Sequence, residues 1–172
     1  MKVVFLTCGP RGAGKTTYCH MIKAQYSEVE IISRDTYLTS LYGTTILPEA
    51  TSADRMHKIN LLMIDRLKEI IKTSDKVILD YWNNSSAGRK TTIKTLRDIG
   101  FDKVLCWYFT TPLKVCDVWV QKKVDTDYTY AKQYQSSYEL FHRGAENISE
   151  DGFDEIVSID PSCLSVHDVI LF

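Results

Sequence analysis

Residues 9–16 read Gly9-Pro10-Arg11-Gly12-Ala13-Gly14-Lys15-Thr16, which matches the phosphate-binding pattern G-x-x-x-x-G-K-[ST]. An apolar run at 3–6 precedes this loop, and a helix-like pattern at 15–26 follows it. The glycines let the backbone curl around phosphate oxygens, and the start of a helix adds partial positive charge. A strand, a glycine loop and a helix in this order predict a site for a nucleoside triphosphate.

The side chains of this loop have separate expected roles. The loop backbone, continued by Thr17, is expected to hold the phosphates. Lys15 is expected to reach the β- and γ-phosphates of ATP, and the Thr16 hydroxyl to ligate Mg²⁺. ATP and Mg²⁺ are therefore the predicted cofactors, and a chance glycine-rich turn is the alternative.

The composition is that of an ordinary globular protein. The 172 residues are 44 % hydrophobic and 25 % charged, with a net charge of −1, so residues 1–172 are predicted to form one domain. Because the chain has no overall positive charge, a nucleic acid would have to be held by a local basic patch. Five scattered cysteines and the lack of a long apolar run favour a cytoplasmic protein without membrane spans, and the oligomeric state is left open.

The chain alternates between strand-like and helix-like segments. Further apolar runs predict strands at 29–32, 77–79, 104–109 and 155–159. Helical periodicity predicts helices at 51–73 with Ser52 as N-cap, at 87–99, from 111, and at 128–141. This alternation predicts an α/β sandwich of the P-loop NTPase type, in which helices flank a five-stranded parallel sheet. Ligands bind such sheets at the carboxyl ends of the strands.

Two aspartates follow predicted strands at this edge. A carboxylate at Asp35 can orient an acceptor hydroxyl and accept its proton during phosphoryl transfer. Asp80 closes the third strand, where it can ligate Mg²⁺ or face the acceptor. The alternatives are that Asp35 caps the short helix after it and that Asp80 is a solvated acid at a strand end.

Beyond the P-loop, three short motifs resemble the phage polynucleotide kinase-like P-loop kinases over most of the chain. The motifs are Arg34-Asp35-x-Tyr37 after the second strand, the strand at 77–80 with Asn83 behind it, and Gly152-Phe153-Asp154-Glu155-Ile156 before the last strand. The resemblance implies that Asp35 is the general base for a 5′-hydroxyl, with Arg34 beside it. It also implies that Asp80, Asn83 and Arg89 lie on the acceptor side, although Arg89 also fits a solvated basic helix face.

The sequence departs from this family at two places. The family carries a phosphate-gripping arginine three positions after the aspartate, where this chain has Leu38. The family lid carries arginines over the ATP phosphates, where this chain has Gln121-Lys122-Lys123. Lys122 and Lys123 are expected to close over the phosphates as part of a helical lid over residues 114–143, and the alternative is that they are lysines at a helix end.

The predicted function is therefore ATP- and Mg²⁺-dependent transfer of the γ-phosphate to a hydroxyl. The expected acceptor is a nucleic acid or nucleotide: the 5′-hydroxyl of a polynucleotide, or a hydroxyl on a nucleotide or modified base. A kinase for a free nucleoside or nucleoside monophosphate is the first alternative, favoured by the near-neutral charge and Leu38. An NTP-binding regulatory module that makes no phosphorylated product is the second.

Overall fold

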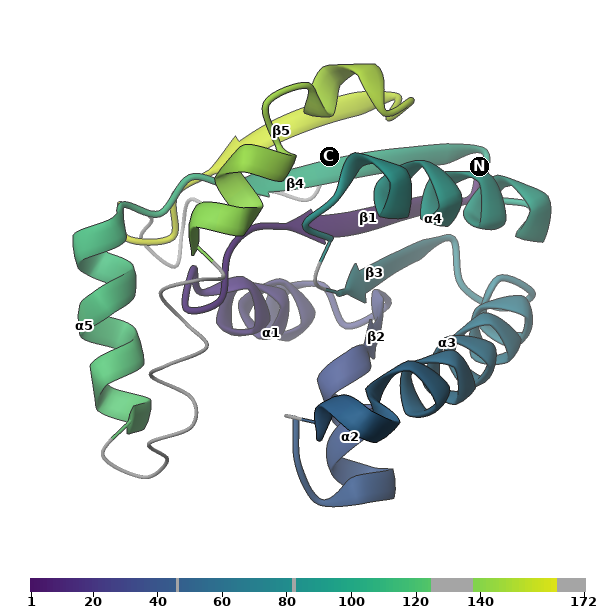
Figure 1. Cartoon of the computed structure of the whole chain (residues 1–172). Coiled ribbons are helices and arrows are strands. Elements are labelled where there is room, and N and C mark those ends of the chain that lie inside the picture. Colours follow the sequence, from purple (N-terminus) through teal and green to yellow (C-terminus); the bar gives the residue numbers. More distant parts are fainter. Residues whose placement is uncertain (46, 82, 125–137, 164–172) are drawn as a thin grey trace.

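A five-stranded sheet organises the protein, whose computed structural model describes residues 1–45, 47–81, 83–124 and 138–163. The strands are β1 (Val3–Cys8), β2 (Glu30–Ser33), β3 (Lys76–Asp80), β4 (Lys103–Phe109) and β5 (Glu155–Ile159). All neighbouring strands are parallel, and their order is β2-β3-β1-β4-β5 (Figure 1). The predicted fold class is therefore confirmed, and every predicted strand is present.

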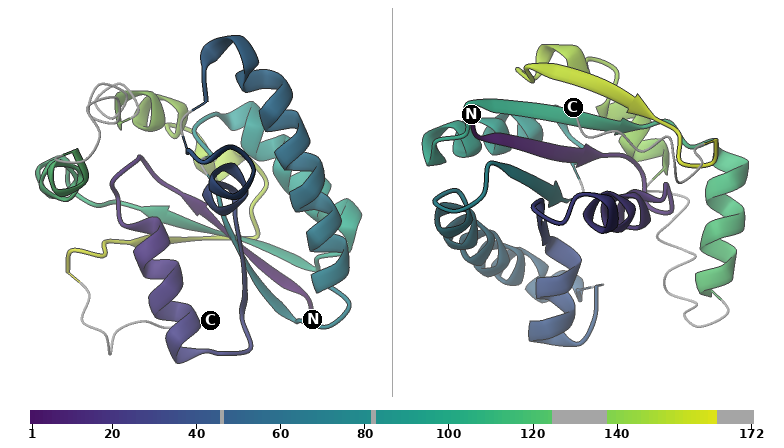
Figure 2. Two further views of the ribbon diagram at one scale, coloured as in Figure 1. Left: turned by 90° about the horizontal axis from the view of Figure 1, so that it is seen from below. Right: turned by 180° about the vertical axis from the view of Figure 1, so that it is seen from behind.

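Helices cover both sides of this sheet (Figures 1 and 2). They are α1 (Lys15–Gln25), α2 (Arg34–Tyr42), α3 (Glu49–Ile70), α4 (Ser86–Ile99) and α5 (Leu113–Val124). Residues 138–144 form a further helix, and a 3₁₀ turn spans Ile148–Glu150. The predicted Ser52 cap is wrong, because Pro48 is the N-cap of α3. Residues 125–137, which include most of the predicted helix at 128–141 and part of the predicted lid, lie outside the described residues.

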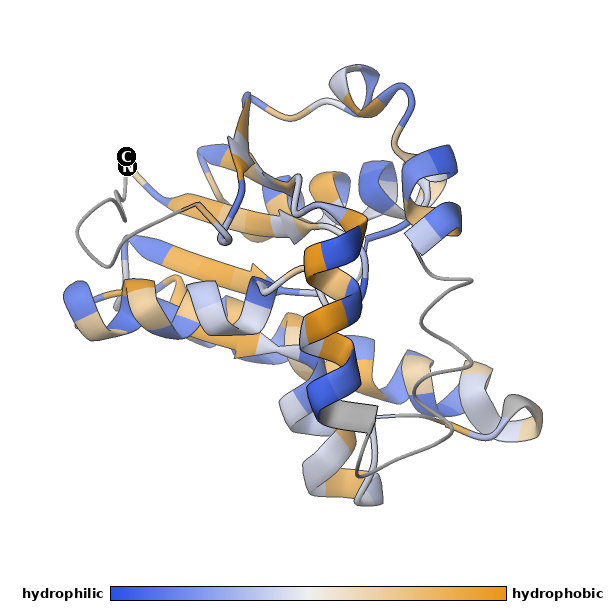
Figure 3. Ribbon diagram, turned by 90° about the vertical axis from the view of Figure 1, so that its left-hand side faces the viewer, coloured by the Kyte–Doolittle hydropathy of each residue, from blue (hydrophilic) through white to orange (hydrophobic). Residues whose placement is uncertain are grey.

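The strands are nearly continuous apolar runs because both faces of the sheet are covered. On one face, side chains such as Val4 and Leu79 pack against α3 and α4. On the other face, side chains such as Phe5 and Ile78 pack against α1 and α5. Figure 3 shows the result, in which the strands are largely hydrophobic and the helices carry both hydrophobic and hydrophilic residues. Within the described ranges, no helix combines the length and the apolar character needed to cross a membrane.

A buried ion pair joins α4 to the segment before β5. The side chains of Arg89 and Asp151 are both fully buried, and Arg89 Nε donates to Asp151 Oδ2 over 2.5 Å. Arg89 also donates to the carbonyl oxygens of Asn83 and Gly144, at 3.3 and 2.6 Å. A Cβ added at Gly144 would lie 1.8 Å from the carbonyl oxygen of Asn84, so the chain can pass this close only as glycine. The predicted substrate-binding role of Arg89 is therefore wrong. The alternative prediction, that Arg89 lies on a solvent-exposed basic face of α4, is wrong as well.

The Gly152-Phe153-Asp154-Glu155-Ile156 motif also supports the fold. Asp154 Oδ2 accepts hydrogen bonds from the backbone N–H of Val104, at 2.7 Å, and from Arg97, at 3.0 Å. The backbone N–H of Asp154 in turn donates to the carbonyl oxygen of Val104, at 3.0 Å. The motif thus fixes the start of β5 against β4.

Candidate active site

The P-loop connects the end of β1 to the first residue of α1, as the sequence predicts. Gly14 is the N-cap of α1 and has φ 83°, a left-handed conformation that glycine adopts without strain. A Cβ at Gly14 would also lie 2.9 Å from the ring of Trp119 in α5. The hydroxyl of Thr111, in the connection between β4 and α5, donates to the carbonyl oxygen of Ala13 at 2.8 Å. The loop is therefore held by both α5 and the segment that follows β4.

The Lys15 side chain is half-buried within this loop. Its ammonium group donates to the carbonyl oxygens of Gly9 and Pro10, at 2.9 and 2.7 Å. Burial lowers the pKa of Lys15 to about 8, against the attraction of Asp80 and Asp35, which raises it. A lowered lysine pKa means that the charged form costs free energy here. Anionic oxygens placed in the loop would relieve that cost.

Asp80 is the centre of a cluster of hydroxyl groups at the end of β3. It is 6 % exposed, and Thr16 Oγ1 donates to its Oδ2 over 2.7 Å. Ser33 Oγ donates to the same oxygen at 3.4 Å, and Thr7 Oγ1 lies 3.3 Å from Oδ1. The sheet register explains this convergence, because Ser33 pairs with Asp80 and β1 runs alongside β3. Asp80 is therefore no solvated acid, and its pairing with Thr16 gives the hard oxygen ligands that Mg²⁺ prefers.

Asp35 lies in the first turn of α2 and is held by the residue before it. Arg34 Nε and Nη2 both donate to Asp35 Oδ1, at 3.1 and 2.8 Å. The Arg34 side chain is only 11 % exposed, whereas that of Asp35 is 50 % exposed. The helix begins after Ser33, so Asp35 is not its N-cap. The carboxylate is therefore fixed on one oxygen and open to the pocket, which a hydroxyl acceptor requires.

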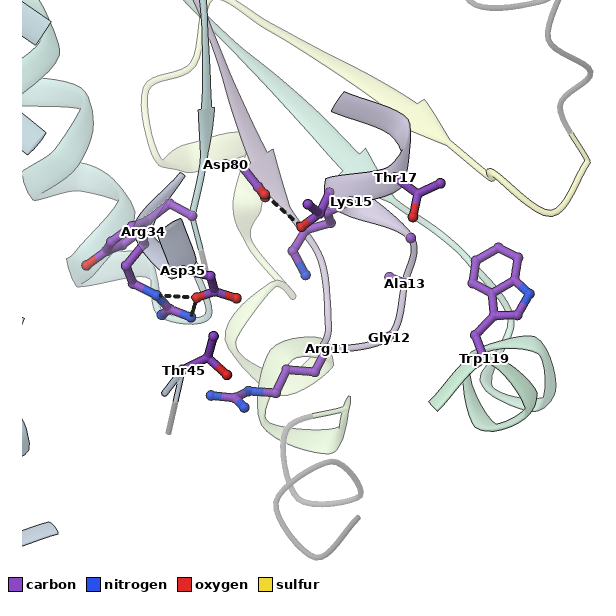
Figure 4. A pocket seen from close by; sticks show the side chains of 13 residues that line it. Arg11, Gly12, Ala13, Lys15, Thr17, Arg34, Asp35, Thr45, Asp80 and Trp119 are labelled. Carbon is purple, nitrogen blue, oxygen red and sulfur yellow. Dashed lines mark hydrogen bonds and ion pairs between the residues drawn. The ribbon is translucent and has the colours of Figure 1, made fainter. Parts of the chain in front are cut away.

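These groups line one pocket, shown in Figure 4. Its walls are the loop from Arg11 to Thr17, the Arg34–Asp35 pair, Thr45, Asp80, Tyr81 and Trp119. In Figure 4 the Arg34–Asp35 pair and Trp119 lie on opposite sides of Lys15, and the Arg11 side chain extends toward Thr45. The pocket thus brings together the predicted residues Lys15, Thr16, Arg34, Asp35 and Asp80.

Three other positions that the sequence singled out, Asn83, Leu38 and Lys122, do not line this pocket. Asn83 is 3 % exposed, and its amide donates to the backbone carbonyls of Thr7 and Tyr81, so the predicted contact with substrate is wrong. Leu38 is 1 % exposed in the core, so the change from arginine says nothing about the acceptor. Lys122 is exposed near the end of α5, where Trp119 is the described residue that lines the pocket. The side chain of Lys123 lies outside what the structure describes.

The structure also adds residues that the sequence did not indicate. Thr7 and Tyr81 flank Asp80, Thr45 lies in the connection between α2 and α3, and Trp119 lies in α5. Two of these residues could have been suspected from the sequence: Thr7 lies just before the P-loop, and Tyr81 directly follows Asp80 at the end of β3. Trp119 and Thr45 carry no such signal, because each enters the pocket only through the packing of a separate element.

The sequence belongs to a known family. Residues 4–146, most of the chain, match the family described as an AAA domain, so the protein is a member of that family. Among curated protein sequences, none matches the chain.

Solved structures share the fold at low sequence identity. A candidate kinase from Chloroflexus aurantiacus has a TM-score of 0.70 and 12 % identity, over 98 % of this chain and 91 % of that one. A fungal RNA kinase has a TM-score of 0.60 and 18 % identity, over 98 % and 79 %. A chain of the Pnkp1/Rnl/Hen1 RNA repair complex has a TM-score of 0.65 and 13 % identity, over 83 % and 45 %, so this protein spans less than half of that chain. The fold is therefore that of the P-loop kinases, and the resemblance to polynucleotide kinase-like members is confirmed at that level.

Proposed function

We propose that this protein transfers the γ-phosphoryl group of ATP to a hydroxyl of a polynucleotide or nucleotide. The observation that carries the proposal is the half-exposed Asp35 carboxylate, which Arg34 holds by one oxygen in the same pocket as Lys15. A kinase that transfers to a phosphate needs no base, whereas a kinase that transfers to a hydroxyl gains from a carboxylate that accepts its proton. This arrangement therefore favours an alcohol acceptor.

The remaining groups of the pocket fit the donor nucleotide. The backbone N–H groups of the P-loop and the Lys15 ammonium would bind the phosphates and hold the γ-phosphoryl group in line with the acceptor. Thr16 and Asp80 are the residues that would hold Mg²⁺, which neutralises the charge that develops on the phosphate oxygens. The base would stack on Trp119, because that ring lies across Lys15 from the Arg34–Asp35 pair.

Two observations support a nucleic acid or nucleotide as the acceptor. The fold is shared with a fungal RNA kinase and with a chain of an RNA repair complex. The pocket is also lined by Arg11, Lys15 and Arg34, whose positive charge suits an acceptor that bears phosphate. A free nucleoside is the rival, and salt dependence separates the two, since only binding that contacts several phosphates weakens strongly as salt rises.

Asp35→Asn is expected to lower the rate of phosphate transfer by about 100-fold while ATP binding is retained, because only the proton acceptor is lost. The assay uses γ-labelled ATP, Mg²⁺ and a panel of acceptors: 5′-hydroxyl DNA and RNA, DNA with hydroxymethylated bases, nucleosides and nucleoside monophosphates. Asp98→Asn, an exposed carboxylate on α4, is the matched control and should remain active. Label on small molecules alone would establish the small-molecule kinase, and ATP hydrolysis with no labelled acceptor would favour the regulatory module.

The affinity for ATP is expected to fall as the pH rises above about 8. Burial holds the pKa of Lys15 at about 8 without nucleotide, and bound phosphates favour the charged form and raise that pKa. At a pH between the Lys15 pKa of the free protein and its higher value in the complex, ATP binding is accompanied by the uptake of a proton. The affinity is therefore highest below pH 8 and falls by up to about tenfold per pH unit above it. Calorimetry with a non-hydrolysable ATP analogue in buffers of different ionisation enthalpy measures both effects. In Lys15→Met this pH dependence should disappear, and a flat profile in the wild type would contradict the assignment.

A further inference from the structure

Tyr81, the residue directly after Asp80, is held by one hydrogen bond at its backbone N–H and by another at its side-chain hydroxyl. Its backbone N–H donates to Thr7 Oγ1 at 3.1 Å, and its hydroxyl donates to Asn60 Oδ1 of α3 at 3.2 Å. The ring therefore spans from the end of β3 to α3 with little freedom to turn. Tyr81 lines the pocket that holds the P-loop, yet it contributes no group to the phosphate or metal ligands described above.

The Arg34 guanidinium lies over the face of this ring, with its Cζ 5.5 Å from the ring centroid. A cation at this distance is attracted by the ring's negative face, and the attraction is stronger when the cation is removed from water. The Arg34 side chain is only 11 % exposed. An arginine side chain has several freely rotating bonds, so a fixed aromatic face limits where its planar fork can point.

The direction of the guanidinium matters because Arg34 directs two of its N–H groups to a single oxygen of Asp35. Nε and Nη2 both reach Oδ1, so Arg34 leaves the second carboxylate oxygen to the pocket. A guanidinium that turned on its stem could reach that second oxygen instead and compete with an acceptor hydroxyl. The alignment of Asp35 therefore depends on the alignment of Arg34, and through it on the ring of Tyr81.

We propose that Tyr81 is a positioning residue, whose ring holds Arg34 so that Asp35 keeps one oxygen available to the acceptor hydroxyl. The proposal rests on the role of Asp35 proposed above. Tyr81 contacts neither the donor nor the acceptor in this scheme. It acts on the rate of transfer through Arg34, and it leaves nucleotide binding to the P-loop.

Two substitutions at Tyr81 separate the ring from its hydroxyl. Tyr81→Leu removes the aromatic face and is expected to lower kcat about tenfold, with the Kd for ATP unchanged. Tyr81→Phe keeps the ring and should retain activity within about threefold, since it loses only the hydrogen bond to Asn60. In an Arg34→Gln background, Tyr81→Leu should cause no further loss, because the group on which the ring acts is gone. An equal loss in both backgrounds, or an unchanged kcat in Tyr81→Leu, would overturn the proposal.

A spectroscopic measurement tests the contact without relying on catalysis. The Arg34 Nε–H resonance should be shifted upfield by the ring current in the wild type and in Tyr81→Phe, and the shift should be lost in Tyr81→Leu. Retention of the shift in Tyr81→Leu overturns the contact itself. If the shift behaves as expected but Asp35→Asn remains active, the proposed function fails, whereas the contact between the Tyr81 ring and Arg34 is still supported. If Asp35→Asn loses activity and Tyr81→Leu does not, only the role of Tyr81 fails.

Discussion

Arg89→Met is expected to lower the free energy of unfolding by about 3–5 kcal/mol, because the buried carboxylate of Asp151 then keeps only the exposed Lys90, 4.0 Å away, as a cation. Methionine replaces the apolar stem of arginine but ends about where Nε lies, so the loss is chiefly that of the guanidinium, with its charge and its hydrogen bonds. The bonds to Asp151, Asn83 and Gly144 join α4, the segment after β3 and the segment before β5. Chemical denaturation followed by circular dichroism measures the change.

Arg97→Met provides the matched control for this prediction. Arg97 lies on the same helix and also pairs with an aspartate, but its side chain is 39 % exposed. An exposed pair of this kind contributes about 1 kcal/mol or less. A second variant, Arg89→Met with Asp151→Leu, removes both charges and should recover part of the lost stability. A loss below about 1 kcal/mol in Arg89→Met would show that the pair does not hold these segments together.

The parts of this fold that were predicted correctly are those that local sequence determines. Apolar runs mark the strands because parallel strands covered on both faces need apolar side chains at nearly every position. The P-loop is recognisable because its glycines, lysine and threonine are adjacent in the chain. Asp35 and Asp80 were predicted to lie at one edge because strand ends in a parallel sheet converge there, and the resemblance to the kinase family added the expected role of Asp35 as a base.

The parts that were missed depend on partners that are distant in the sequence. A charged residue in an amphipathic helix is ordinarily exposed, and what buries Arg89 is Asp151, which lies 62 residues further along the chain. Leu38 was interpreted as a changed acceptor contact because its place in the motif was known but its direction was not. Trp119 and Thr45 enter the pocket only because α5 and the connection between α2 and α3 pack where they do. No local pattern of residues encodes such contacts.

Lys15→Met is expected to reduce phosphate transfer by about 1,000-fold, since it removes the charge that would stabilise the phosphates during transfer. Its effect on the fold should be the opposite of that of Arg89→Met. The Lys15 ammonium bonds only to the neutral carbonyls of Gly9 and Pro10 among its described hydrogen-bond partners, and its lowered pKa means that its burial opposes folding. The Tm of the variant without nucleotide should therefore be unchanged or higher.

Radiolabel transfer and differential scanning calorimetry test the two halves of this prediction together. Lys23→Met, in the same helix but partly exposed, should change neither quantity appreciably. Activity within about tenfold of wild type would show that Lys15 has no major role in phosphate transfer. A marked fall in Tm would show that Lys15 stabilises the P-loop in the absence of nucleotide. A loss of activity with no loss of stability is expected for a residue that is needed for ligand binding or catalysis but does not stabilise the folded protein. Arg89, whose charge is satisfied inside the protein, should show the reverse pattern, because its loss damages the fold first and the site only through it.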